Sequence, residues 1–425
     1  MAKQQFQSVR GTHDILPDEQ PRFKQVTATF AALAEEAGYR KIDTPVLEDA
    51  GLFVRSVGGD TDIVEKEMYS FKDRSDNQLT LRPEPTAGVA RAYIEHGMSS
   101  LPKPVKLYIT GEMFRYDRPQ AGRQRQFNQV GVEVFGEAAP SIDAQVIILA
   151  YRYLRSLTMS GVTVQINSIG DEVCRPKYKK ALVDYLKSRI DDLCPDCKRR
   201  LESNPLRVLD CKEPGCAKVV EGAPQIVDFL CKPCHAHFTG VLEYLDEFDV
   251  PYELNHLLVR GLDYYTRTVF EVYGAREGAQ SALGGGGRYD GLIQELGGQA
   301  TPAVGFGLGV ERIIIELDFA KAPLPNKQPV KVFVASLGEP ARLAGFKLLE
   351  QLLDGRVGAV GAIDKDGIAA QLGRADKLGA PYAIIIGQKE VFDKTVILRD
   401  MASGAQEMIP LNKIVEELQK RFAGA

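Results

Sequence analysis

An arginine, an acid and two tyrosines follow an apolar run in the segment from Leu257 to Thr266. The apolar residues predict a buried strand that ends at Arg260, and Gly261 allows the backbone to turn sharply after it. A guanidinium fixed at the end of a rigid element can bind a phosphate or a carboxylate. Tyr264 and Tyr265 supply rings with polar ends, which suit a ligand that is part aromatic and part polar. The alternative is a solvated arginine beside two tyrosines that only pack.

A second segment predicts a β-hairpin with a long tip. Two β-rich runs, residues 107–115 and 129–135, are joined by a loop that contains proline and glycine. Because side chains alternate along a strand, Gln129, Gly131 and Glu133 share one face and the intervening valines share the other. A glycine between a carboxamide and a carboxylate leaves floor space for a ligand that both side chains can touch.

The hairpin also carries cations. Arg115 ends the first strand beside this floor, and the tip is basic and rich in amides. The tip residues are Arg118, Gln120, Arg123, Gln124, Arg125 and Gln126. Such a tip can contact phosphates and read base edges in splayed RNA. The alternative is a solvated charged loop, but the tip has no compensating acid beyond Asp117.

Glycine alternates with apolar residues in Val304–Gly309, and a helical pattern follows. This order predicts a closely packed strand that runs into a helix, with Arg312 near the helix N-terminus, where anions are favoured. The glycines match neither a P-loop nor the dinucleotide-binding fingerprint. Gly284–Gly287 predicts a further strand over which a backbone or a ligand packs closely. Three arginines at element ends above glycine-lined floors describe a nucleoside triphosphate site on an antiparallel sheet.

Together these segments resemble the class II aminoacyl-tRNA synthetases. The hairpin resembles motif 2 of that family, and Gly307–Arg312 resembles motif 3. The stretch from Pro21 to Leu47 resembles motif 1, which implies a homodimer. Arg260–Thr266 and Arg288–Gly291 resemble the two signatures of the histidyl-tRNA synthetase family. The resemblance covers nearly the whole chain.

The resemblance implies an α+β fold with an antiparallel-sheet catalytic domain, a helical insertion and a C-terminal α/β anticodon-binding domain. The catalytic domain is expected at residues 1–170 and 252–320, with the mostly helical insertion at 171–251. A proline-rich linker at 321–329 and the anticodon-binding domain at 330–425 follow.

Beyond the linker, the sequence itself predicts a small parallel or mixed α/β domain. Strands are expected at residues 330–335 and 382–387, and helices at 341–353 and 411–422. The alternation of strands with helices is typical of such a sheet.

The resemblance implies a histidine–tRNA ligase, which activates L-histidine with ATP and Mg²⁺ and transfers it to the 3′ end of tRNA(His). Arg115, Arg260 and Arg312 would be the catalytic cations that bind the phosphates, and Asp117 would contact the adenine. Asp117 stands where the family usually has the longer glutamate. Three tip residues would contact the tRNA, so that their loss would impair charging but not adenylate formation. These are Arg118, Gln120 and Arg123.

The resemblance also implies a pocket for histidine. Its residues would be Glu84, Thr86, Gln129, Glu133, Tyr264, Tyr265 and Tyr289. The first three would bind the α-amino group, while Glu133 and Tyr265 would read the imidazole. Pro85 stands where the family usually has glycine, and proline has no N–H to donate.

Length and charge set wider limits. A chain of 425 residues is long enough for two to three domains, and its net charge of −4 argues against nonspecific nucleic-acid binding. No apolar run approaches the ~20 residues of a transmembrane helix. Residues 1–20 lack an apolar signal core, so we expect a cytoplasmic protein.

Six of the seven cysteines form pairs in the expected insertion. The pairs are Cys194 and Cys197, Cys211 and Cys216, and Cys231 and Cys234. Such pairs in an intracellular protein indicate zinc more than disulfides, whereas the resemblance supplies no metal requirement here. We therefore expect reduced thiols and no metal, with zinc as the alternative. Cys174 is expected to be an ordinary buried thiol.

Two other functions remain as alternatives. A non-catalytic paralogue, such as the regulatory subunit of a histidine-biosynthetic ATP phosphoribosyltransferase, would bind histidine and transfer nothing. It would have no physical reason to keep arginines that bind a triphosphate or a domain that binds an anticodon. A zinc-dependent RNA-binding protein would explain the cysteines but not the cleft.

Overall fold

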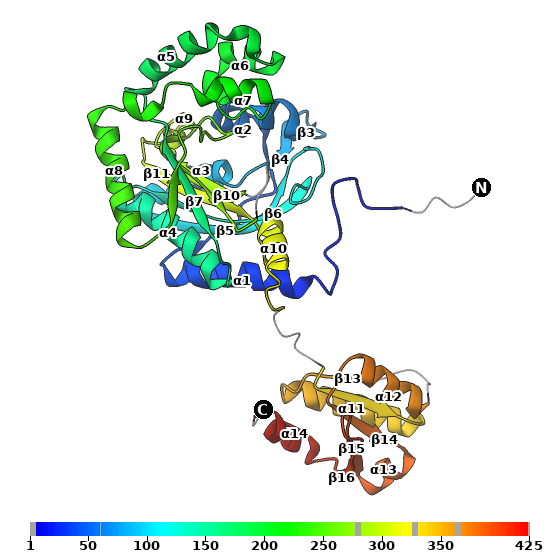
Figure 1. The fold of residues 1–425 in the computed structure, drawn as a ribbon. Coiled ribbons are helices and arrows are strands. Elements are labelled where there is room, and N and C mark those ends of the chain that lie inside the picture. Colours follow the sequence, from blue (N-terminus) through cyan, green and yellow to red (C-terminus); the bar gives the residue numbers. More distant parts are fainter. Residues whose placement is uncertain (1–5, 60, 277–281, 325–329, 362–366, 424–425) are drawn as a thin grey trace, which may run out of the picture. The chain divides into compact units, whose positions relative to one another are not determined.

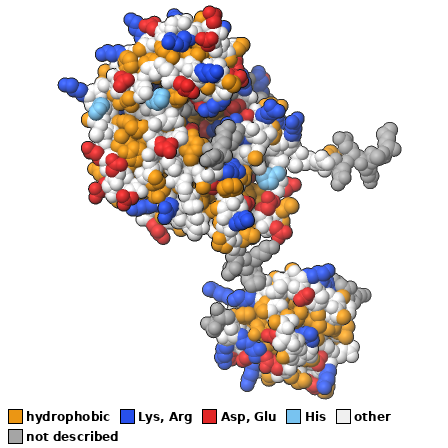
Figure 2. Space-filling view, viewed as in Figure 1, with side chains coloured by type: hydrophobic (Ala, Val, Ile, Leu, Met, Phe, Trp, Pro, Cys, Tyr) orange, Lys and Arg blue, Asp and Glu red, His pale blue; other side chains and the backbone are white. Residues whose placement is uncertain are grey.

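The computed structural model describes all residues except 1–5, 60, 277–281, 325–329, 362–366 and 424–425 (Figure 1). The chain divides into two compact units, Met1–Pro323 and Leu324–Ala425, each with its own hydrophobic core. The division falls inside the segment expected to be a linker, of which 325–329 lie outside the described residues. Charged side chains of both signs are interspersed over the face seen in Figure 2.

An eight-stranded sheet forms the centre of the first unit, in the order β1-β5-β6-β11-β10-β9-β7-β8. Its strands are β1 (Arg40–Lys41), β5 (Val105–Phe114), β6 (Gln126–Phe135), β7 (Thr163–Ser168), β8 (Tyr252–Leu254), β9 (Thr266–Tyr273), β10 (Ala282–Arg288) and β11 (Ala303–Gly309). Only the outer pairs β1·β5 and β7·β8 are parallel among these described pairings. The predicted hairpin is β5–β6, and the two glycine-rich strands are β10 and β11.

Long helices cover one face of this sheet (Figure 1). They are α1 (Gln20–Glu36), α4 (Pro140–Ser156), α8 (Lys232–Glu247) and α10 (Val310–Phe319). In α1, Val26, Phe30 and Ala34 recur every four residues and therefore lie on one buried face. They pack with the valines of β6 in the main core. The expected side-chain alternation in β6 is confirmed on this face.

A smaller layer flanks the other face. It contains α2 (Ala50–Val57), a π-helical turn (Ile63–Glu67), α3 (Thr86–Glu95), a 3-10 turn (Met98–Ser100), α9 (Leu292–Glu295) and a three-stranded sheet of β2 (Leu47–Asp49), β4 (Gln78–Leu81) and β3 (Tyr69–Lys72). Between β7 and β8 the chain forms α5 (Arg175–Lys187), α6 (Pro195–Ser203), α7 (Pro214–Glu221) and α8, with 3-10 turns at Ile190–Asp192, Pro205–Val208 and Ile226–Phe229. Helices α5 to α7 share a second core with α2 and α3.

The second unit contains a mixed five-stranded sheet, as the sequence predicts. Its elements are β12 (Val332–Ser336), α11 (Glu339–Asp354), β13 (Ala359–Gly361), α12 (Ile368–Lys377), β14 (Tyr382–Ile386), α13 (Gln388–Asp393), β15 (Thr395–Asp400), β16 (Gln406–Pro410) and α14 (Ile414–Ala423). Strands β13, β12 and β14 are parallel, while β15 and β16 are antiparallel. None of the helices in the described part of the chain is both long and apolar enough to cross a membrane.

The strand predicted directly before Arg260 is absent, and that prediction is wrong. Strand β8 ends at Leu254, and the Asn255 side chain then accepts a hydrogen bond from the backbone of Leu257 (3.0 Å). The Asn167 amide donates to the carbonyl of Leu258 (3.1 Å). Since polar side chains satisfy these backbone groups, the run forms an Asx-type turn instead of pairing in a sheet. Arg260 therefore lies in the loop between β8 and β9.

Candidate active site

A strip of glycines crosses the sheet on the face away from α1 and α4. The strand register aligns Gly131 of β6, Gly307 of β11 and Gly285 of β10 side by side. A Cβ atom at Gly285 would lie 2.9 Å from Nη1 of Arg260, and one at Gly307 would lie 3.6 Å from the Gln129 amide. Side chains at these positions would thus occupy the space between the predicted ligand-binding groups. The glycines keep a flat floor open there.

A cavity of about 560 Å³ lies over this floor. From the sheet, its hairpin, the β8–β9 loop and α10, the lining includes Arg115, Asp117, Arg123, Gln129, Arg260, Glu271, Glu311 and Arg312. From the insertion, it includes Cys194, Asp196, Arg200, Arg207, Asp210, Cys211, Lys212 and Glu213. The three arginines predicted to be catalytic are therefore brought together in one cavity, and the insertion forms part of its wall.

The arginines are held in place by protein oxygens. Nε of Arg115 donates to the carbonyl of Pro83 (2.8 Å), and Nε of Arg312 donates to the carbonyl of Gly122 in the hairpin tip (2.9 Å). The pKa of Arg312 is lowered, first by burial and then by the positive charges of Arg123 and Arg115. The cations repel one another in this cavity, and an anion with several charges would relieve that repulsion.

Two polar atoms at the cavity are buried without a hydrogen-bond partner in the described structure: Nε of Arg260 and Oε1 of Gln129. Buried polar atoms are nearly always paired in folded proteins, so unpaired ones require an explanation. Nη1 of Arg260 is paired with the carboxylate of Glu271 in β9. A ligand on the glycine floor would supply the missing partners.

Six of the seven residues predicted to bind histidine form a buried cluster on the same side of the sheet, and the seventh, Gln129, is half-buried in the cavity lining. Glu133 accepts hydrogen bonds from the Thr86 hydroxyl (2.6 Å) and from the Tyr289 hydroxyl. The Tyr264 hydroxyl donates to Glu84 (3.3 Å). Three tyrosine rings pack together, with centroids 4.6 Å apart between Tyr264 and Tyr265 and 5.5 Å apart between Tyr264 and Tyr289.

Burial makes the Glu133 carboxyl a weak acid. Its pKa is raised to about 8, chiefly by burial and further by the charge of Glu84, while the hydrogen bonds from Thr86 and Tyr289 act in the opposite direction. A buried carboxyl without a cationic partner keeps its proton. A positively charged ligand at this position would favour the carboxylate.

Pro85 fits the local structure without cost. It occupies the N-cap position of α3 with a φ of −88°. The carboxylate of Glu84 accepts from the backbone N–H groups of Thr86 (2.8 Å) and Ala87 (2.7 Å) instead. Since those donors come after residue 85, the N–H that proline lacks is not needed to hold Glu84.

The hairpin tip folds against the cavity. Arg118 and Arg123 are both exposed, and Arg123 also lines the cavity and pairs with the carboxylate of Asp117 (3.1 Å). Arg123 therefore lies beside Arg115 and Arg312 in the cavity lining. The tip is therefore part of the cavity wall as well as a surface feature.

Sequence reasoning missed two residues. Glu271 lies in β9 and forms an ion pair with Arg260. It is the one acidic residue in an otherwise largely apolar strand, and this signal could have revealed it. Arg288, which begins a recognised signature, is fully buried and pairs with Asp143 of α4, as does His237 (2.8 Å). Arg288 is thus a core residue that supports the neighbouring Tyr289.

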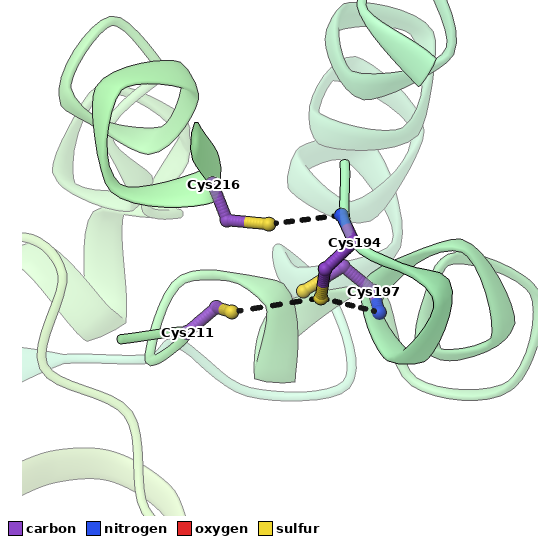
Figure 3. A group of neighbouring side chains, drawn as sticks. All are labelled: Cys194, Cys197, Cys211 and Cys216. Atoms are coloured by element: carbon purple, nitrogen blue, oxygen red, sulfur yellow. Dashed lines mark hydrogen bonds between the residues drawn. The ribbon is translucent and has the colours of Figure 1, made fainter. Parts of the chain in front are cut away.

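The cysteines form two groups in the described structure, and all are free thiols. One group consists of Cys194, Cys197, Cys211 and Cys216 (Figure 3). The other consists of Asp171, Cys174, Cys231 and Cys234. The pair of Cys231 and Cys234 therefore does not join the other two pairs, and Cys174 lies in a polar cluster.

Comparison with known proteins identifies the family. The profile of the histidyl-tRNA synthetase family matches residues 11–190 and 207–313, and that of an anticodon-binding domain matches 331–421. The chain belongs to the histidyl-tRNA synthetase family. The histidine–tRNA ligase of Dehalococcoides mccartyi strain CBDB1 is 49% identical over 98% of this chain and 100% of that protein. That of Pelotomaculum thermopropionicum is 46% identical over 98% of each.

Solved histidyl-tRNA synthetase structures are also similar. The apo enzyme of S. aureus has a TM-score of 0.82 at 36% identity and covers 97% of this chain and 100% of its own. A Bacillus halodurans protein described as an ATP phosphoribosyltransferase regulatory subunit/histidyl-tRNA synthetase shares the fold, with a TM-score of 0.65 at 22% identity over 90% of this chain and 98% of that one. At this identity the likeness shows a shared fold and does not distinguish between the two functions in that description.

Proposed function

We propose that this histidyl-tRNA synthetase family member is a histidine–tRNA ligase. It activates L-histidine with ATP to histidyl-adenylate and then transfers the histidine to the 3′ end of tRNA(His). The observation that carries the proposal is the joint presence, on the same face of the sheet, of an arginine-lined cavity and a buried cluster of carboxyl and tyrosine side chains. The first suits a triphosphate and the second suits a small cationic amino acid.

The first step requires positioning more than proton transfer. The carboxylate of histidine attacks the α-phosphorus of ATP, the new O–P bond forms, and the bond to the leaving pyrophosphate breaks. Arg115 and Arg260 stabilise the charge that develops at the α-phosphorus, and Arg312 binds the leaving pyrophosphate. No general base is needed because a carboxylate is already a nucleophile at neutral pH.

Mg²⁺ fits the donors of the cavity. Magnesium takes oxygen ligands, often from one or two carboxylates and the substrate phosphates, and the carboxylate of Glu311 in the cavity lining would be one such ligand. When bound, the ion neutralises charge on the β- and γ-phosphates. Glu311 is itself fixed, because it accepts hydrogen bonds from the backbone N–H (2.8 Å) and the amide (3.0 Å) of Asn128.

Recognition of histidine falls to the buried cluster. Glu133 accepts a hydrogen bond from one ring N–H, and the hydroxyl of Tyr265 pairs with the other nitrogen. Glu84, Thr86 and Gln129 bind the α-amino group. An amino acid without two ring nitrogens would leave these groups unpaired, and such losses can reach a factor of about 10⁴ or more.

The tRNA contacts are proposed at two places. The exposed Arg118 and Gln120 of the hairpin tip would contact the acceptor end, and the second unit would bind the anticodon. We also propose a homodimer, supported by exposed apolar side chains on β2, α2 and β3, namely Leu47, Val54 and Phe71. Light scattering after size exclusion should give twice the chain mass of 46.8 kDa.

Histidine-dependent exchange of pyrophosphate into ATP tests the proposal. Exchange with histidine, but not with other amino acids, is expected, followed by charging of tRNA(His). Binding of histidine without any exchange would instead select the regulatory class, which has the same fold. Equilibrium dialysis with labelled histidine separates these outcomes.

A further inference from the structure

The four thiols of Cys194, Cys197, Cys211 and Cys216 converge on one point in the insertion (Figure 3). All four sulfur atoms lie within 4.8 Å of one another, and those of Cys194 and Cys211 are 3.9 Å apart. Zinc bound tetrahedrally by four thiolates at ~2.3 Å would separate neighbouring sulfurs by ~3.8 Å. A disulfide would require ~2.05 Å. The spacing thus fits a shared metal ion better than a bond between any pair.

Backbone N–H groups and helix N-termini lie beside these sulfur atoms. Cys194 is the N-cap of α6, and its sulfur accepts from the backbone N–H of Cys197 (3.4 Å). The backbone N–H of Cys194 in turn donates to the sulfur of Cys216 (3.2 Å). Cys197 and Cys216 lie in the first turns of α6 and α7, where the helix N-terminus favours negative charge.

Simple packing of reduced thiols explains less. Cys197 and Cys216 are fully buried among apolar residues, as ordinary core thiols would be. Cys194 and Cys211 are only half-buried and line the cavity, yet their sulfurs point at the same centre. Convergence of two buried and two half-buried sulfurs is typical of a closed structural Cys₄ site.

We propose that these four cysteines bind one structural zinc ion. Binding releases the thiol protons and couples the metal to folding of residues 194–216. That segment also carries Arg200 and Arg207, which both pair with Asp62 beside the cavity (2.9 and 2.6 Å). The zinc therefore fixes the wall that the insertion contributes to the nucleotide cavity.

The second group of cysteines differs in one respect. Its Asp171 already has a cationic partner in Arg267 (3.5 Å) and accepts from the backbone N–H groups of Val173 (3.0 Å) and Cys174 (3.3 Å). The carboxylate is thus satisfied without a metal ion. Cys231, also half-buried, serves as a matched control for Cys211.

Metal analysis of the full chain, expressed without added metal and purified under reducing conditions, tests the proposal. The parent should contain one zinc per chain that Cys211→Ser and Cys194→Ser both lose and Cys231→Ser retains. Replacement by Co²⁺ should give the visible bands of tetrahedral thiolate coordination in the parent and in Cys231→Ser only. Circular dichroism identifies any variant that fails to fold. In that case the cobalt spectrum of the parent shows whether thiolates bind the metal.

Three results would overturn the zinc site: parent protein without zinc, zinc that survives Cys211→Ser, or a cobalt spectrum without thiolate coordination. A second consequence rests on the proposed function. Removal of the metal by a chelator should raise the KM for ATP in pyrophosphate exchange while leaving that for histidine nearly unchanged, and zinc should restore it. Since metal content does not depend on activity, failure of the zinc site and failure of the proposed function are distinguishable.

Discussion

Arg260, in the loop between β8 and β9, forms an ion pair with Glu271 of β9. Nε of Arg260 takes no part in this pair and has no hydrogen-bond partner in the described structure. The carboxylate thus anchors one side of the guanidinium and leaves the other side for a ligand. Such anchoring reduces the reorganisation that a charge stabiliser would otherwise undergo during reaction.

Arg260→Ala should lower the rate of adenylate formation by roughly 100-fold or more, because a principal stabiliser of developing charge is removed. Affinity for histidine should change little, since the arginine acts mainly in the transition state. Rapid quench of adenylate formation and equilibrium dialysis with histidine measure the two effects. A near-parental rate would make Arg260 structural.

Glu271→Gln keeps the size of the side chain but removes the charge that positions Arg260. We expect a slower adenylate step, and the double variant with Arg260→Ala should be little worse than Arg260→Ala alone, because the two residues act as a unit. Glu253→Gln, on the exposed part of β8, is the control and should be near parental. Additive losses in the double variant would show that Glu271 acts separately.

Glu133→Gln should raise the KM for histidine strongly and leave that for ATP close to normal, because of the two substrates only histidine is proposed to contact this carboxyl. Glu133→Ala should show a larger loss. The outcome against this assignment is a KM that rises for ATP but not for histidine. Recognition of the ring would then pass to Tyr264, Tyr265 and Tyr289.

The same carboxyl should affect stability through pH. Its pKa rises from 4.5 to about 8 on folding, so between these values the folded chain binds more protons than the unfolded chain. Its contribution to the free energy of unfolding therefore falls as pH rises through this window. Thermal melts of ligand-free protein between about pH 6 and pH 9 measure this effect. The melting temperature of Glu133→Gln should rise relative to that of the parent as pH increases. An unchanged difference would mean that Glu133 is ionised in the fold.

The hairpin tip should separate the two reaction steps. Arg118→Ala should reduce charging of tRNA and leave pyrophosphate exchange nearly intact, because Arg118 is exposed. Arg123→Ala should reduce both, since Arg123 lines the nucleotide cavity. The structure thus changes the expectation drawn from the sequence, in which both were assigned to tRNA alone. Equal effects of the two substitutions on exchange would contradict this division.

Much of this site could be predicted because its signals are local. The alternation in β6 and the glycines of β10 and β11 follow from strand geometry alone, and the structure has each of these strands. The loop before Arg260 could not be predicted, because it depends on the Asn167 side chain from a distant strand. The burial of Arg288 likewise depends on Asp143, 145 residues away in the chain. Sequence spacing could not show that Cys231 joins Asp171 instead of Cys194.

The glycine floor has a thermodynamic consequence for every ligand that lies on it. A binding surface made of side chains must give up rotamer freedom when it is occupied, at about 0.5–1.5 kcal/mol for each long side chain that becomes ordered. Gly131, Gly285 and Gly307 have no rotamers to lose, and the backbone beneath them is already held by neighbouring strands. The floor thus contributes contact area with almost no entropic cost of its own, so the ordering cost of binding falls on the ligand and on the arginines around it.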